Sequence, residues 1–335
     1  MGGFNKIAVI GGGSWGTALA TVAARAGRDT VLWARRDDVV RAINERHENE
    51  RALPGIALDE GVRATADIGV VAEADAILLV TPAQTTREVT EGLAALVRPG
   101  TPVVLCAKGI ERETGKLLSE IIAETLPMAV PAVLSGPSFA TDVARNLPTA
   151  VTVAAGDLTL ARALSVALSH AMFRPYASSD IVGVQVGGAL KNVLAIGCGI
   201  VAGRGLGASA QAALTARGFT ELSRLAQTYG VHAETLTGLS CLGDLVLTCS
   251  TPQSRNFSFG IALGRGASVA ELLAEGRALA EGAKTASVAV RIAKERSIEI
   301  PISMAVEAVI EGRITVDEAV AGLMSRPLKS EGEAS

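Results

Sequence analysis

The sequence predicts an α/β domain built on a doubly wound, mostly parallel sheet, followed by an all-α domain. In the first half of the chain, short apolar runs alternate with helical stretches, and continuous runs of valine, isoleucine and leucine are typical of strands buried on both faces of a sheet. From about Ser178 only helical segments follow. With 335 residues, the chain is also longer than most single domains, so two domains are expected. We therefore expect an α/β domain over 1–177, a helical domain over 178–327 and a disordered tail over 328–335.

Apolar runs between turn-forming residues mark the expected strands, which are Ile7–Ile10, Thr30–Ala34, Ala76–Val80, Val103–Cys106, Ala132–Leu134, Ala150–Ala154 and Phe173–Tyr176. The expected helices of the second domain are 180–201, 208–229, 233–239, 241–249, 255–263, 268–275, 283–296, 301–311 and 315–323. Two of these begin at a recognisable capping residue, Ser268 and Thr315, and Thr315 has Glu318 three positions later.

A glycine-rich turn follows the first strand. Gly11, Gly13 and Gly16 stand between that strand and a helix predicted to reach about Ala26, and a second apolar strand comes next. In a strand–turn–helix of this kind one glycine makes the tight turn, one lets the backbone approach a pyrophosphate, and one lets helix and strand pack closely. The helix N-terminus also offers unpaired N–H groups to phosphates. The first domain is therefore predicted to be of the Rossmann type and to bind a dinucleotide.

The end of the second strand bears on which dinucleotide is bound. An acidic residue there commonly holds a free ribose 2′-hydroxyl, but this chain has Arg35 and Arg36, with Asp37 and Asp38 only after them. A guanidinium favours a 2′-phosphate, so NADP(H) is preferred and NAD(H) is possible. Arg36 in particular is also compatible with a solvated surface charge.

Composition excludes several other classes. The formal net charge of −3 argues against nucleic-acid binding and against a basic membrane-binding surface. The four cysteines show no C-x-x-C spacing and lie in apolar contexts, which predicts a reduced, cytoplasmic protein without a metal site. The segment Ile181–Val201 is apolar, but Gln185, Lys191 and Asn192 interrupt it, so a buried helix is expected rather than a membrane span.

Ligands of doubly wound sheets bind beyond the carboxyl ends of the strands. Lys108 follows one predicted strand, and Gly136 with Ser138 follows the next. An ammonium just past a buried strand should lie in the ligand crevice. A lysine that extends to the surface is an equally good interpretation of Lys108 from the residues alone.

Lys191 lies in a helix whose other residues nearby are apolar or glycine, apart from Gln185 and Asn192. Burial disfavours the charged form of an amine, which suits a group that transfers protons near neutral pH. Because the helix has no polar face for a surface lysine, a functional role is favoured. The three histidines stand in charged or turn segments, which leaves a lysine as the preferred acid for reducing a ketone.

Further along, Asp244 is a single charge in an apolar run. It could pair with a buried lysine or cap a helix after Gly243. Ser254, Arg255 and Asn256 stand where a polar loop enters a helix, which suits a phosphate site and also suits ordinary capping with a surface arginine.

Taken together, these segments closely resemble the bacterial-type NAD(P)-dependent glycerol-3-phosphate dehydrogenase family. The matching signatures occur in the family's order over nearly the whole chain, and they are GGGSWGTALA, LPGI at 53–56, CAKGIERETG, SGPSFA, LKNVLAIGCGI, ARGFTE, LGDLVLTCS and QSRNFSFG.

The resemblance implies reversible conversion of dihydroxyacetone phosphate and sn-glycerol 3-phosphate for phospholipid synthesis, commonly by a homodimer. It implies that the Rossmann domain over 1–177 binds the dinucleotide, that the helical domain over 178–327 binds the substrate, and that Lys191 is the acid/base residue. The residues that it places around the substrate are Lys108, Gly136, Ser138, Lys191, Asp244, Ser254, Arg255 and Asn256. With the glycine turn included, the cofactor contacts expected are Gly11, Gly13, Ser14, Trp15, Gly16, Arg35, Arg36, Lys108, Ala140, Arg255, Leu279 and Glu281.

The chain departs from the family pattern at five positions, which are Ser209, Gln211, Ala216, Cys241 and Phe257. None is a proposed proton-transfer residue, but the packing around the site could differ. Two rival functions remain at this stage. One is a related two-domain dehydrogenase that acts on a hydroxy acid and also uses a lysine, and the other is a non-catalytic NADP-binding regulator.

Overall fold

The structure is a computed structural model, and it describes residues 3–274 and 280–328. The predicted cofactor contact Leu279 and the predicted tail from residue 329 onward lie outside the described residues.

Contacts between residues divide the chain into two compact units, which we call the sheet unit and the helical unit. The sheet unit comprises Met1–Glu111 and Lys116–Gln185, and the helical unit comprises Arg112–Gly115 and Val186–Ser335. By this division the chain passes from one unit to the other after Gln185, and the short segment Arg112–Gly115 groups with the helical unit.

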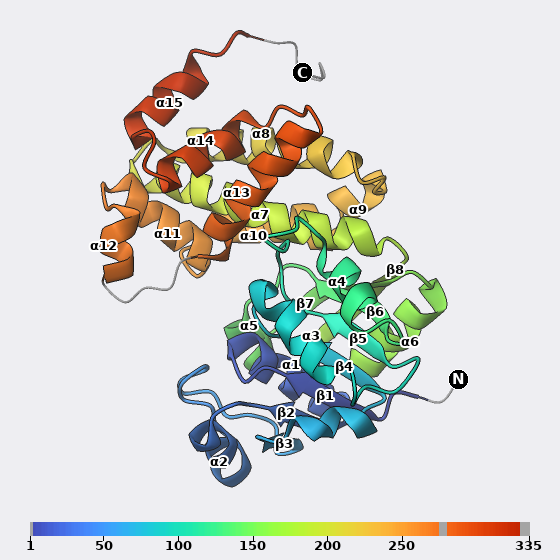
Figure 1. Cartoon of the computed structure of the whole chain (residues 1–335). Helices are drawn as coiled ribbons and strands as arrows, with labels where there is room; N and C mark the ends of the chain where they lie inside the picture. Colours follow the sequence, from blue (N-terminus) through green and yellow to red (C-terminus); the bar gives the residue numbers. More distant parts are fainter. Residues whose placement is uncertain (1–2, 275–279, 329–335) are drawn as a thin grey trace. The chain divides into compact units, whose positions relative to one another are not determined.

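The sheet unit contains one eight-stranded sheet, in the order β3-β2-β1-β4-β5-β6-β7-β8 (Figure 1). All neighbouring strands are parallel except β6 and β7, which are antiparallel. The strands are β1 Lys6–Ile10, β2 Asp29–Trp33, β3 Val62–Thr65, β4 Ala76–Leu79, β5 Pro102–Leu105, β6 Val130–Ser135, β7 Thr149–Ala155 and β8 Phe173–Ser178. This order places β1 between β2 and β4, where the connections change direction, and confirms the predicted doubly wound, mostly parallel sheet.

Among the strands of the sheet, β3 is the one that the sequence prediction missed. It is an edge strand of four residues, in which Val62 and Ala64 are buried while Arg63 is exposed and Thr65 is half-buried. Two buried apolar residues in alternation give too short a pattern to distinguish a strand from a loop.

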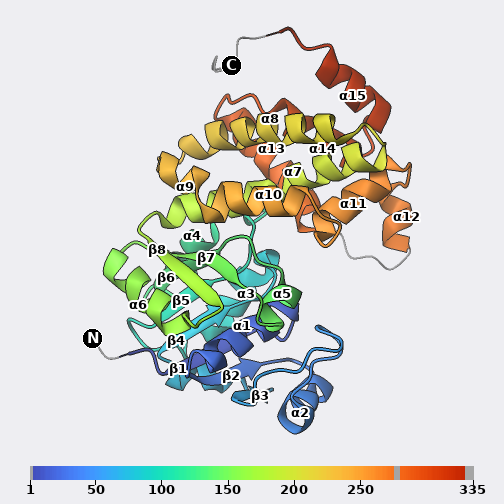
Figure 2. The same cartoon turned by 180° about the vertical axis from the view of Figure 1, so that it is seen from behind.

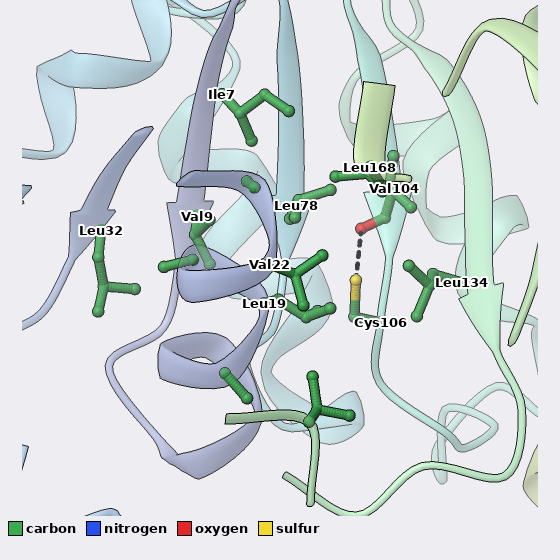
Figure 3. Packing of buried hydrophobic residues seen from close by; sticks show 14 of the residues in the cluster. Ile7, Val9, Leu19, Val22, Leu32, Leu78, Val104, Cys106, Leu134 and Leu168 are labelled. Carbon is green, nitrogen blue, oxygen red and sulfur yellow. Dashed lines mark hydrogen bonds between the residues drawn. The ribbon is translucent and has the colours of Figure 1, made fainter. Parts of the chain in front are cut away.

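Helices cover both faces of this sheet, and successive strand residues point to opposite faces. Figure 3 shows one of the two apolar layers, in which Val9 and Leu78 of the sheet pack with Leu19 of α1. On the other face, Ile10 and Ile77 pack in a second layer with α3 and α4. The helices of this unit are α1 Ser14–Arg25, α2 Asp37–Arg46, η1 Ile68–Glu73, η2 Ala83–Thr85, α3 Thr86–Leu93, α4 Leu118–Thr125, α5 Ala140–Ala144 and α6 Leu158–Leu168.

Every element described after β8 is helical, as predicted (Figure 2). The elements are α7 Ile181–Gly203, α8 Ala208–Gln227, α9 Ala233–Thr237, the π-helix η3 Leu239–Gly243, α10 Asp244–Cys249, α11 Arg255–Gly264, α12 Val269–Ala274, α13 Glu281–Glu295, α14 Pro301–Ile310 and α15 Val316–Met324. The predicted caps are present. Thr315 and Glu318 form a capping box at the start of α15, and Ser268 accepts a hydrogen bond from the N–H of Glu271.

The helix α7 is apolar and long enough to span a membrane by length and composition, but 89% of its most apolar window is buried inside the protein. It is therefore the central helix of a core, as the interrupting polar residues predicted.

Glycines let α7 and α11 approach backbone to backbone. A Cβ atom added to Gly199 would lie 2.1 Å from the carbonyl oxygen of Phe257, and one added to Gly203 would lie 2.3 Å from that of Ile261. The reciprocal positions on α11 are equally close, because a Cβ on Gly260 would lie 2.1 Å from the oxygen of Ile196. No residue larger than glycine fits at these positions without moving a helix.

A buried carboxylate fixes the start of α14. Glu221 of α8 is 2% exposed and accepts hydrogen bonds from the N–H groups of Ile302 and Ser303 and from the Ser303 hydroxyl. Burial nevertheless raises the pKa of Glu221 to about 7, although these hydrogen bonds and the charge of Arg224 act in the opposite direction.

This raised pKa predicts that stability falls as pH rises. Between pH 4.5 and about 7 the unfolded chain releases a proton that folded Glu221 retains, so the free energy of unfolding decreases through that window. We expect Glu221→Gln to remove about 1–3 kcal/mol of this decrease, as measured by urea unfolding on either side of the window. The exposed Glu295→Gln is the matched control. Equal pH dependence in wild type and Glu221→Gln would contradict the prediction.

Candidate active site

The glycine turn after β1 has the geometry of a phosphate-binding turn. Gly11 has a φ of +130°, which L residues with side chains rarely adopt, and a Cβ on Gly16 would lie 1.9 Å from the Gly11 oxygen. Gly11 thus makes the turn, and Gly16 allows α1 to pack against it. A Cβ on Gly13 would have no atom within 4 Å, so the space beside this residue is open.

The helix α1 starts at this open space. Its N-cap is Gly13, no side chain caps the helix, and its first turn has no acidic residue. The free N–H groups and the positive end of the helix dipole are therefore available to an anion. Ser14 is exposed beside them, whereas Trp15 is half-buried and packs against the apolar core.

The two arginines after β2 differ in their partners. The Arg36 guanidinium binds Asp38 through two hydrogen bonds of 2.9 and 2.7 Å, in an exposed ion pair. Arg35 is exposed, and it makes no ion pair with any residue in 3–274 or 280–328. Both arginines are predicted to contact the cofactor, and Arg35 is the one whose guanidinium is available for a 2′-phosphate.

Lys108, Gly136 and Ser138 lie together at the carboxyl edge of β5 and β6. The Lys108 ammonium donates to the Gly136 oxygen at 3.2 Å, and the Ser138 hydroxyl donates to the same oxygen at 3.1 Å. Lys108 is half-buried, so it bends over the end of the neighbouring strand and does not extend into solvent. Ala140 begins α5 after this segment.

In the helical unit, Lys191 of α7 is 4% exposed and is held by two groups of α10. Its Nζ lies 2.5 Å from the Oδ1 atom of Asp244 and 2.5 Å from the Thr248 hydroxyl. The Thr248 hydroxyl also lies 3.2 Å from Asp244 Oδ1. Asp244 therefore pairs with the lysine and does not cap α10, and this decides between the two interpretations that its sequence context allowed.

Thr248 is a member of this cluster that sequence reasoning missed. It stands four residues after Asp244, and residues at that spacing lie on the same side of a helix. That spacing was visible in the sequence, but a threonine in an apolar helix carries no signal of its own.

The start of α11 is joined to the start of α13. Ser254 caps α11 by accepting a hydrogen bond from the N–H of Phe257, and the Asn256 Oδ1 atom accepts one from the N–H of Gly282. Gly282 packs so closely on α7 that an added Cβ would lie 2.4 Å from the oxygen of Asn192, the residue after Lys191. Arg255 is exposed at the first position of α11, and Glu281 is half-buried at the first position of α13.

The five residues at which this chain departs from the family pattern fit their surroundings. Cys241 is fully buried against Gly187, where an added Cβ would lie 2.7 Å from that of Cys241, and burial raises the pKa of its thiol to about 12. Gln211 donates to the carbonyl of Cys249 at 2.7 Å. Phe257 is buried in α11. Two further departures, Ser209 and Ala216, are exposed.

In the sheet unit these features fit an anionic dinucleotide. The sheet unit offers an uncapped helix, an open backbone at Gly13 and an exposed guanidinium at Arg35, and the helical unit offers a buried amine whose charge is balanced. Within the described ranges, no group of three or more histidine, cysteine or acidic residues could hold a metal ion.

Comparison with known proteins identifies the family. Residues 6–161 match the model of the NAD-dependent glycerol-3-phosphate dehydrogenase N-terminus, and residues 180–321 match that of its C-terminus. The chain belongs to this family. A glycerol-3-phosphate dehydrogenase [NAD(P)+] of Parvibaculum lavamentivorans is 56% identical, with 98% of each chain covered, and one of a Bradyrhizobium species is 58% identical with the same coverage.

Solved structures of the family agree with the fold. The glycerol-3-phosphate dehydrogenase of Coxiella burnetii superposes with a TM-score of 0.90 at 38% identity, over 96% of this chain and 99% of that one. A D-mandelate dehydrogenase with a TM-score of 0.64 is only 17% identical over 94% of this chain and 99% of that one, so it shares the fold alone.

The buried pair predicts a strong energetic coupling between Lys191 and Asp244. Asp244→Leu should destabilise the protein by about 3–5 kcal/mol, because it leaves an ammonium buried without its counter-charge, and Lys191→Met should also destabilise it by leaving the carboxylate unpaired. The double variant Lys191→Met with Asp244→Leu removes both charges and should recover most of these losses, as measured by urea unfolding. If the two single losses simply add in the double variant, the pair is not coupled.

Proposed function

We propose that this protein catalyses the reversible reduction of dihydroxyacetone phosphate to sn-glycerol 3-phosphate with NADPH or NADH, and so supplies glycerophospholipid synthesis. Membership of the glycerol-3-phosphate dehydrogenase family over both halves of the chain supports the reaction. The observation that carries the proposal is the buried Lys191, paired with Asp244 and Thr248 in the position where this family's motif predicts its acid.

Lys191 is the proposed proton donor. Reduction of a ketone places negative charge on its oxygen, and a bound nicotinamide supplies the hydride for this step. Asp244 supplies the counter-charge that a buried ammonium needs, and together with Thr248 it fixes the direction in which the Lys191 Nζ points. In the reverse direction, the neutral amine accepts the proton of the alcohol.

Arg255, Asn256 and Ser254 are the proposed phosphate site at the start of α11. The Ser254 oxygen already accepts a bond from within its helix, and the Asn256 Oδ1 is used by Gly282. Contacts to a phosphate can therefore come from the Ser254 O–H, which is still free to donate, from the Arg255 guanidinium, from the Nδ2 of Asn256, and from N–H groups of the first turn. Lys108, Gly136 and Ser138 complete the proposed set of substrate contacts.

The cofactor is proposed to bind along the carboxyl edge of the sheet. Gly11, Gly13, Ser14, Trp15 and Gly16 would surround its pyrophosphate. The remaining contacts that we propose are Arg35, Lys108, Ala140, Arg255 and Glu281, with Leu279 also proposed from the family resemblance. Arg36 is the least favoured candidate, since Asp38 already binds it.

We also propose a homodimer that works in the cytoplasm. The dimer is supported by the family resemblance. The compartment is supported by the four cysteines, which are all buried free thiols, as expected of a protein that folds under reducing conditions.

Oxidation of NADPH by dihydroxyacetone phosphate tests the function directly. We expect turnover with this substrate, and none with keto acids or with unphosphorylated dihydroxyacetone, when absorbance of the reduced nicotinamide is followed. Turnover of keto acids alone would favour a hydroxy-acid dehydrogenase. Cofactor binding without turnover of any ketone would favour a regulator.

In the same assay Lys191→Ala should lower kcat by about 10²- to 10⁴-fold, the usual contribution of a general acid, while the Kd for NADPH changes little. A urea unfolding curve shows whether the variant is folded. Lys191→Met, which keeps most of the side-chain volume, separates loss of the amine from loss of packing. Unchanged turnover in a folded variant would remove Lys191 from the mechanism.

Arg35→Ala should weaken NADPH binding by about 10- to 100-fold, corresponding to one lost charge-assisted contact, and should barely affect NADH. Arg36→Ala is the matched control, because Asp38 already binds that guanidinium, and it should have the smaller effect. Fluorescence titration with each cofactor measures both. An equal loss of affinity for NADPH and NADH would show that Arg35 does not contact the 2′-phosphate.

A further inference from the structure

The loop between α2 and β3 closes on itself and contacts the glycine turn. The N–H of Leu58 donates to the oxygen of His47 at 2.8 Å, and Glu48 and Ala57 form an isolated antiparallel bridge. Inside the loop, the N–H group of Leu53 donates to the oxygen of Asn49 at 2.7 Å. We call residues 47–58 the docked loop. It includes the LPGI segment, for which the proposed reaction gives no role.

Apolar side chains hold the docked loop against the sheet unit. Leu53 is 2% exposed, and Ile56 and Leu58 are each 6% exposed, in the apolar cluster that also contains Val9 and Leu19. Burying three such side chains contributes several kcal/mol, about 1.5–3 for each. The loop is therefore a fixed part of the core and can position other groups.

Asn49 connects this loop to the glycine turn. Its Nδ2 group donates to the oxygen of Gly12 at 3.1 Å and to the Thr17 hydroxyl of α1 at 2.8 Å. A second connection is the Ser14 hydroxyl, which donates to the Ala52 oxygen at 2.6 Å. Asn49 is 1% exposed, so it cannot contact a ligand that lies in solvent-accessible space.

The bond to the Gly12 oxygen also controls the direction of an N–H group. In a trans peptide the carbonyl and the following N–H point in opposite directions. Because Asn49 holds the Gly12 oxygen towards the docked loop, the N–H of Gly13 points away from that loop. Gly13 is the residue of the turn beside which an added Cβ would meet no atom.

The burial of Asn49 is itself unfavourable in one respect. Its Oδ1 atom is buried and has no hydrogen-bond partner among the described residues. An unsatisfied buried acceptor destabilises a fold. The two hydrogen bonds that Nδ2 donates, to the Gly12 oxygen and the Thr17 hydroxyl, therefore explain why an asparagine stands here.

We propose that Asn49 is a positioning residue, which holds the glycine turn in the conformation that binds the cofactor pyrophosphate. This role rests on the proposed function. The role extends that function, because it assigns part of the cofactor affinity to a side chain that does not touch the cofactor.

The test compares Asn49→Ala and Asn49→Leu with the control Asn44→Ala. Asn44 is a matched residue, because it also fastens a neighbouring segment by donating to the Ala64 oxygen at 2.9 Å and accepting from the Ala64 N–H at 2.8 Å. It does not contact the glycine turn. The Leu variant keeps the branching and the number of side-chain heavy atoms of Asn49 and loses the donor without adding a charge, so it also serves if the Ala variant fails to fold.

We expect both Asn49 variants to raise the Kd for NADPH about tenfold, the size of one lost hydrogen bond. The Kd for adenosine 2′-monophosphate, which lacks the pyrophosphate, should stay unchanged in titrations of the full chain. The KM for NADPH should rise while kcat and the KM for dihydroxyacetone phosphate do not. Asn44→Ala should bind NADPH like wild type, even where urea unfolding shows a comparable loss of stability.

Three outcomes would overturn the proposal. One is unchanged NADPH affinity in a folded Asn49 variant, another is an equal loss for NADPH and adenosine 2′-monophosphate, and the third is the same loss in Asn44→Ala. Failure of the wild-type protein to bind NADPH would instead overturn the proposed function, and this role with it.

Discussion

A charged amine in an apolar helix is possible only where its charge is balanced, and this constraint shapes the helical unit. Lys191 is almost completely buried in α7, whose other residues provide no counter-charge. The carboxylate and hydroxyl that it needs come from α10, whose first residue is Asp244. The packing of α10 against α7 is therefore set by electrostatics as well as by apolar contact. A buried pair of this kind adds little net stability, but it fixes the amine in one place, and fixed geometry is what proton transfer requires.

Most of the fold could be predicted from the sequence because its signals are local. Buried parallel strands are continuous apolar runs, and helices begin at residues such as Thr315 that form a cap with a glutamate three positions later. The strand that was missed, β3, is an edge strand with only two buried apolar residues, Val62 and Ala64. Its place in the sheet depends on pairing with β2, which is a long-range interaction that no local pattern encodes.

The site was predictable to a lesser degree, because side-chain partners depend on packing between distant segments. The sequence showed Lys191 and Asp244 as charges out of place, but only the structure shows that they meet and that Thr248 joins them. It also pairs Arg36 with Asp38, in line with the surface role that the sequence already allowed for that arginine. Asn49 gave no signal at all, because an asparagine in a polar loop is ordinary, and its importance follows from the turn that it contacts.

The glycine contact between α7 and α11 has a consequence for the geometry of the proposed site. Lys191 is on α7 and the proposed phosphate residues begin α11, and the two helices touch through main-chain atoms at Gly199, Gly203 and Gly260. Main-chain contact thus fixes how far apart the two helices carry the amine and the proposed phosphate residues. On the proposed reaction, moving these two backbone positions relative to each other would require the helices to slide along each other.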